Sequence, residues 1–181
     1  KLYKKNKVIR EEFVDTKLIG TEDFLFNVYA FYYADVITFI PEVLYHYRYG
    51  NPHSLTRGYP KDFKRKWVNL FERVSNFVEQ CALDDDFRAA LRNRICLSYI
   101  GLSMRVISAS DLTEKEKKKE LQAIRELPTY NRAFSGWKLQ QFPIHWQVYF
   151  FFVKYHLYLP LYYLCRIMYT MRCKRMLVVT K

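Results

Sequence analysis

The sequence has little glycine and proline, five and six of its 181 residues, and this excludes collagen-like and low-complexity chains. Its four cysteines, at positions 81, 96, 165 and 173, form no Cys-x-x-Cys pair, and no histidines stand near them at zinc-binding spacing. No stretch of eighteen residues is free of charge, which argues against a single membrane-spanning helix. The sequence therefore predicts a reduced, intracellular protein without a structural metal.

Acidic residues are missing from the last part of the chain. Residues 127–181 contain eight lysines and arginines and no aspartate or glutamate, and they supply most of the net charge of +12. The same stretch is rich in aromatic residues, which make up 18% of the whole chain. A basic, aromatic surface attracts anionic membranes and nucleic acids alike, so composition does not choose between them.

Hydrophobic spacing predicts an α+β protein that is mainly helical. A helix is expected after Glu22, followed by short strands at Val36–Ile40 and Val43–Tyr49, because these runs are rich in β-branched and aromatic residues. Further helices are expected at Asp62–Cys81, Asp84–Ile107 and Thr113–Leu127, and a pair of amphipathic or interfacial helices within 128–181. We place the domain boundary between residues 59 and 60, with a helical extension over 60–181.

Four short motifs follow one another in the first domain. They are Lys-Leu-Tyr-Lys-Lys at the start, Glu-Asp-Phe-Leu-Phe-Asn at 22–27, Ile-Pro-Glu-Val-Leu-Tyr-His-Tyr-Arg at 40–48 and Ser-Leu-Thr at 54–56. In this order they resemble the last third of a GT-A-fold, family 2 glycosyltransferase domain, as found in bacterial enzymes that build capsular or cell-surface polysaccharide. The resemblance implies the end of a GT-A α/β domain and a segment cut from a longer enzyme.

The resemblance also implies a catalytic base. In this family the aspartate of the Glu-Asp pair takes the proton from the acceptor hydroxyl, and the matching residue is Asp23. Glu22 and Asn27 are expected to contact acceptor hydroxyls or to support Asp23. Arg48, with the neighbouring His46, Ser54 and Arg57, is expected to contact the donor diphosphate, because a guanidinium binds phosphate oxygens with two parallel hydrogen bonds.

The nucleotide site of the family, with its Asp-x-Asp motif, would lie upstream of this chain. We therefore expect Mg²⁺ or Mn²⁺ in the complete enzyme, no metal site in this fragment, and no turnover by the fragment alone. The expected substrates are a nucleotide-sugar donor and a polysaccharide or lipid-linked glycan acceptor. The expected location is the cytoplasm, or the inner face of the cell membrane as a peripheral protein.

The basic, aromatic end contains the candidates for membrane contact, because aromatic and basic side chains favour the headgroup region. These candidates are Trp146, Lys154, Arg166, Arg172, Lys174 and Arg175. The alternative is that the aromatic residues form the core of a helical subdomain, with or without a homodimer interface.

Two other function classes stay open. In the first, the chain is a noncatalytic helical interaction or oligomerisation domain, and Glu22-Asp23 only favours the start of a helix. In the second, it is a basic nucleic-acid-binding module. The lysines at 115–119 alternate with glutamates, as on a solvated helix face, so we predict no nucleic-acid partner.

Overall fold

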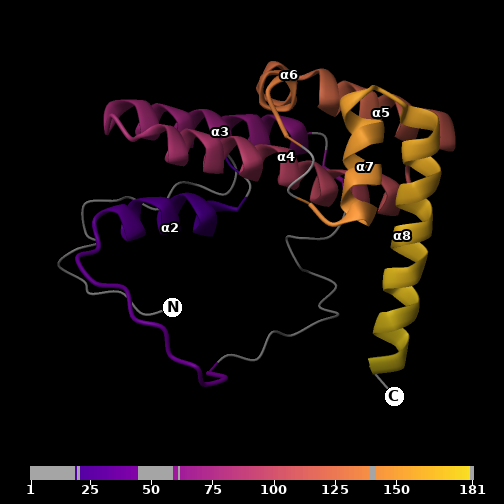
Figure 1. Ribbon diagram of the computed structural model, residues 1–181. Coiled ribbons are helices and arrows are strands. Elements are labelled where there is room, and N and C mark those ends of the chain that lie inside the picture. Colours follow the sequence, from indigo (N-terminus) through magenta and orange to yellow (C-terminus); the bar gives the residue numbers. More distant parts are fainter. Residues whose placement is uncertain (1–18, 20, 45–58, 61, 139–141, 180–181) are drawn as a thin grey trace. The chain divides into compact units, whose positions relative to one another are not determined.

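The computed structural model describes residues 19, 21–44, 59–60, 62–138 and 142–179, apart from the side chains of residues 22 and 173–179. All regular secondary structure in these ranges is α-helical (Figure 1). The chain divides into two compact units, Lys1–Cys81 and Ala82–Lys181.

The first unit contains α2 (Glu22–Tyr32) and α3 (Phe63–Gln80). Helix α3 is amphipathic and buries one face, which confirms the helix predicted at 62–81. Aromatic edges join the two helices, since the rings of Tyr29 and Tyr32 lie 4.6 and 5.1 Å from the ring of Phe77. Helix α3, which the sequence assigned to the extension, therefore packs in the same unit as α2.

The prediction of short strands is wrong for the part of these segments that the structure describes. Residues 34–44 follow α2 without helix or strand pairing, and residues 45–49 lie outside the described ranges. A β-branched run favours a strand only where a neighbouring strand and a buried face receive it, and no described residue provides either. The described chain is all-helical, so the predicted α+β end of a GT-A domain is corrected to a helical architecture.

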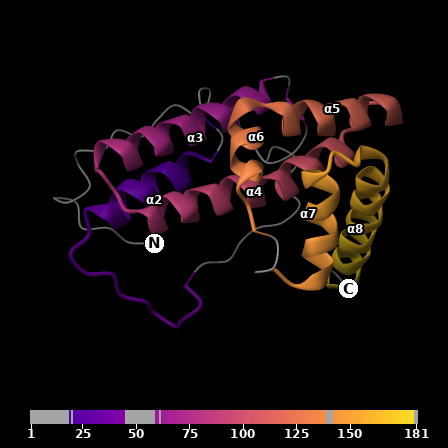
Figure 2. The ribbon, with the colours of Figure 1, turned by 45° about the horizontal axis from the view of Figure 1, so that its top comes forward.

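The second unit is built around the long helix α4 (Asp85–Ser108). Helices α5 (Glu114–Glu126), α6 (Pro128–Ser135) and α8 (Tyr158–Val179) contact it, and α7 (Ile144–Lys154) lies beside α8 (Figures 1 and 2). The predicted helices at 84–107 and 113–127 are thereby confirmed.

The core of the second unit is aromatic and fixed by buried hydroxyl groups. Two serines of α4 meet tyrosines of other helices, with Ser98 Oγ 2.8 Å from Tyr130 Oη and Ser103 Oγ 2.7 Å from Tyr149 Oη. Burial raises the pKa of both phenols, so they stay neutral. Because an unpaired buried hydroxyl is costly, these pairs favour one register of the helices around α4.

A buried arginine joins three helices of this unit. The side chain of Arg125 in α5 donates from Nε to the carbonyl of Val153 at 3.2 Å and from Nη1 to Asn131 Oδ1 at 3.1 Å. Its guanidinium carbon also lies 4.7 Å from the centre of the Phe134 ring. Burial lowers the pKa of Arg125, although a guanidinium stays protonated. Arg125 is therefore a cation held mainly by neutral partners.

Helix α5 begins with a complete capping box. The Thr113 side chain accepts a hydrogen bond from the backbone N–H of Glu116, and the Glu116 carboxylate accepts one from the backbone N–H of Thr113 at 2.8 Å. We expect Thr113→Ala to lower the free energy of unfolding by about 1 kcal/mol, because it removes the cap. Urea denaturation followed by circular dichroism measures the loss. Thr170→Ala, an exposed threonine within α8, serves as the control and should change stability less.

Acid titration checks the same cap independently. Hydrogen bonds from Thr113 lower the pKa of Glu116 below its ordinary value of 4.5, and Lys118 lowers the pKa of Glu114 in the same way. A lowered folded-state pKa adds stability above the unfolded value, and this stability is lost as the pH falls through the folded pKa. In Thr113→Ala the acid-dependent part that comes from Glu116 should shrink, while an unchanged acid profile would contradict the role of the cap.

Candidate functional site

The predicted catalytic residue lies in the first turn of α2. Thr21 precedes the helix with φ 59° and ψ 55°, and its side chain makes no capping hydrogen bond. A β-branched residue in this left-handed conformation is strained, by about 1–2 kcal/mol. Strained backbone of this kind occurs often at functional sites. Asp23 is the second residue of the helix and is separated from Thr21 by Glu22.

The Asp23 carboxylate is exposed to solvent and, within the described chain, forms neither an ion pair nor a hydrogen bond. Asn27 lies one turn later, where its side-chain amide donates a hydrogen bond to the backbone carbonyl of Asp23. Through this hydrogen bond Asn27, which was expected to support Asp23, contacts its main chain and not its carboxylate. The backbone of Glu22 begins the helix, and its side chain is outside the description.

The other predicted donor-site residues, His46, Arg48, Ser54 and Arg57, all lie outside the described residues. The structure therefore gives no geometry for them relative to Asp23.

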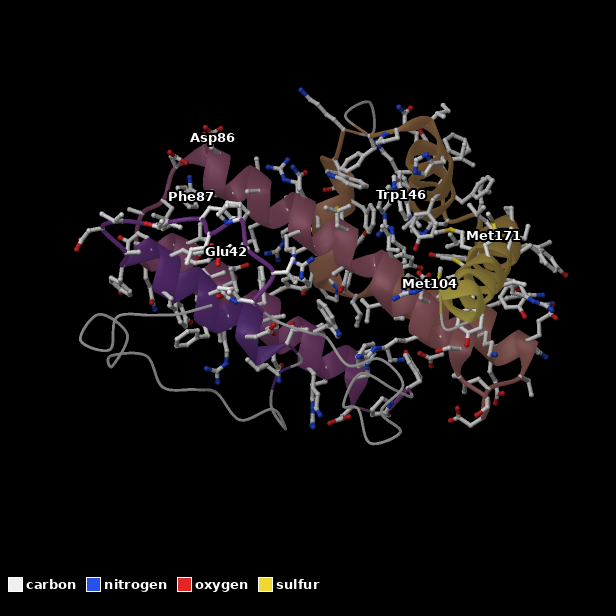
Figure 3. All side chains as sticks on the ribbon, turned by 90° about the horizontal axis from the view of Figure 1, so that it is seen from below. Glu42, Asp86, Phe87, Met104, Trp146 and Met171 are labelled. Carbon is white, nitrogen blue, oxygen red and sulfur yellow. The ribbon has the colours of Figure 1, made fainter. Side chains whose placement is uncertain are left out.

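The segment after α2 exposes most of its apolar side chains. Val36 is 80% exposed, Phe39 86% and Val43 83%, and Ile37 and Leu44 are also open to solvent. Figure 3 shows this segment with Glu42 labelled. Exposed apolar side chains gathered in one short segment are typical of a surface that meets a partner, a membrane or a ligand. The sequence indicated apolar runs here but not their exposure, which depends on the neighbours that the segment finds.

The predicted membrane-contact residues have different surroundings. Trp146 in α7 is half-buried and packs on Tyr149 and Phe150, with ring centres 5.9 and 6.3 Å away. Lys154 ends α7 and donates to the carbonyl of Trp137 at 3.3 Å. Both side chains therefore take part in the packing of the second unit.

The candidates on α8 lie on a more exposed helix. Arg166 is exposed, lies 3.8 Å from a carboxylate oxygen of Glu114 and stacks over the ring of Tyr162. Arg172 is exposed, and Lys174 and Arg175 belong to the same helix, although their side chains are not described. Sequence reasoning did not single out the exposed aliphatic residues Ile144, Val148 and Ile167 of these two helices. Their recurrence every three or four residues, together with the exposed aromatic residues Phe151 and Tyr163, is the signal that would have found them.

Two further observations concern membrane-spanning helices and metal-binding groups in the described part of the chain. None of these helices is both long and apolar enough to cross a bilayer. Among the same residues, no group of three or more His, Cys, Asp or Glu side chains is arranged to hold a metal ion.

The lysine-rich face of α5 has its charge partly balanced. Lys118 Nζ lies 2.9 Å from a carboxylate oxygen of Glu114, and these residues border a shallow hollow of about 410 Å³. Lys115, Lys119 and Tyr158 also line this hollow. Paired charges of this kind are typical of a solvated helix face.

Comparison of the chain with protein-family models, with curated proteins and with solved structures finds no match.

Proposed function

We propose that this chain forms part of an inverting glycosyltransferase of family 2, in which Asp23 is the general base. The observation that carries the proposal is the Asp23 carboxylate itself, exposed and unpaired in the first turn of α2, two residues after the strained Thr21. A general base must reach its substrate, and a carboxylate engaged in a structural ion pair would not be free to accept a proton.

In the proposed reaction the acceptor hydroxyl attacks the anomeric carbon of a nucleotide sugar. Its proton passes to a carboxylate oxygen of Asp23, a new carbon–oxygen bond forms, and the bond from the anomeric carbon to the diphosphate breaks. The nucleoside diphosphate leaves with the electron pair. Asn27 would hold the backbone at Asp23, so that the carboxylate keeps its direction.

The described residues do not fit the divalent cation that such enzymes use, since they contain no suitable group of ligands. We therefore assign the metal and the nucleotide to another part of the enzyme, while Arg48 remains the residue of this chain expected to contact the donor diphosphate. The exposed apolar segment at 36–44 supports this division, because it offers a surface for that part to cover.

The experiment that tests the proposal is a nucleotide-release assay on the complete protein encoded by the gene. We expect release of a nucleoside diphosphate from one member of a panel of nucleotide sugars, and faster release when a glycan or lipid-linked acceptor is added. Release by none of the donors would contradict the proposal. Calorimetry on residues 1–181 alone should show no tight binding of the same donor, and tight binding there would overturn the assignment of the donor site to another part.

A further inference from the structure

Helix α7 is apolar on two opposite sides. Its inner side buries Tyr149, Phe150 and Val153 completely. Its outer side carries exposed apolar residues at helical spacing, of which Ile144 has the largest exposed fraction, 73%. These residues are Ile144, Val148 and Phe151 of α7 and Tyr155, which directly follows the helix.

Helix α8 repeats this arrangement. It buries Leu161, Tyr162 and Cys165, and four apolar residues spaced four apart are exposed on another side of the helix. These residues are Leu159, Tyr163, Ile167 and Met171. We call α7 and α8, with the short connection between them, the hairpin, and the two sets of four residues its apolar rows. Figure 3 labels Met171 in the second row.

A helix that is apolar all round normally has all its sides covered. Here α7 packs against α8, and α8 against α4 and α5, so the inner sides are covered and the apolar rows are not. Eight large apolar side chains on two adjacent helices exceed the scattered apolar residues of an ordinary surface. The rows therefore need an apolar environment beyond the described residues.

The charge of this region indicates which environment that is. Residues 127–181 carry eight basic residues and no acidic ones, and Lys138, Arg166 and Arg172 are exposed. Among the residues that the structure describes, the carboxylate that approaches Arg166 is that of Glu114 in α5, 3.8 Å away. Tyr163 also donates a hydrogen bond to Glu114 at 3.4 Å, whereas residues 127–181 contain no carboxylate side chain of their own. Apolar rows beside this excess of cations complement a membrane surface with anionic headgroups, where tyrosines such as Tyr155 and Tyr163 also partition favourably.

We propose that the α7–α8 hairpin docks on an anionic lipid surface, with the apolar rows at the level of the acyl chains and Arg166 and Arg172 among the headgroups. No described helix qualifies as a membrane span, so the hairpin lies in the interface. This inference does not depend on the proposed sugar transfer, since it uses only the second unit.

Vesicle co-sedimentation of the full chain tests the docking. We expect binding to vesicles of phosphatidylcholine with phosphatidylglycerol, weaker binding at high salt, and little binding to phosphatidylcholine alone. The double variant Ile144→Ser, Ile167→Ser should bind at least roughly tenfold more weakly. Arg172→Gln should lose about fivefold, and only on the anionic vesicles.

Phe87→Ser is the matched control, because Phe87 is 52% exposed in the first turn of α4 and lies outside the apolar rows. It should bind vesicles as the unchanged chain does, and circular dichroism should show that all variants stay folded. Absence of binding to anionic vesicles at low salt would overturn the proposal. So would equal binding by the double variant, or a homodimer that depends on Ile167 in a chain that binds no vesicles.

Discussion

Asp23→Asn is expected to lower kcat for sugar transfer by the complete enzyme by about 10² to 10⁴, with the affinity for the donor largely unchanged. The substitution keeps the size and shape of the side chain but removes its capacity to take a proton at neutral pH. Because Asp23 is exposed to solvent, we expect the variant to fold as the unchanged chain does. Steady-state rates of nucleotide release, together with the dissociation constant of the donor, measure the two effects separately.

Asp86→Asn provides the control for helix electrostatics. Asp86 is exposed and is the second residue of α4, as Asp23 is the second residue of α2, so both variants remove the same favourable interaction with a helix N-terminus. We expect Asp86→Asn to leave transfer unchanged. Full activity of Asp23→Asn, or an equal loss in the two variants, would show that Asp23 only stabilises the start of a helix.

The second large effect concerns the core of the second unit. Phe134 is completely buried, and its ring lies 5.4 Å from that of Trp137 and 5.9 Å from that of Tyr99. We expect Phe134→Ala to lower the free energy of unfolding by about 3–5 kcal/mol, because it removes this packing and leaves a cavity beside the buried Arg125 guanidinium. Such a loss is a large part of the stability of an ordinary domain.

Urea denaturation of the full chain, followed by tryptophan fluorescence, measures this loss because Trp137 and Trp146 both lie in the second unit. Phe87→Ala removes the same side chain from an exposed position and should cost much less. An equal loss of unfolding free energy in Phe134→Ala and Phe87→Ala would contradict the stabilising role of the packing around Phe134.

The helix boundaries in the second unit were predictable because their signals are local. Asp84 accepts hydrogen bonds from the backbone N–H groups of Asp86 and Phe87, and Thr113 forms a capping box, so short stretches of sequence are enough to define both starts. The start of α2 at Glu22 was predicted in the same way from its acidic first turn.

The lack of strands at residues 36–44 could not be predicted in this way. The apolar, β-branched residues of this segment would suit a strand in a sheet. A strand also needs a neighbouring strand to pair with, and the sequence pattern of one segment does not show whether such a neighbour exists. Similarly, α8 is apolar on several sides, so its sequence did not reveal that Tyr162 is buried while Tyr163 is half exposed. The identity of the catalytic candidate came from motif resemblance alone, and the structure adds its exposure.

The buried Arg125 limits how the hairpin can respond to a lipid surface. Its hydrogen bond to the carbonyl of Val153 holds the end of α7 against α5. The next residue, Lys154, donates a hydrogen bond to the carbonyl of Trp137. Moving α7 away from the other helices would leave the Arg125 guanidinium in an apolar interior without this hydrogen bond, which would cost much free energy. We therefore expect the second unit to bind to a bilayer and dissociate from it as one rigid body, with its helices still packed together.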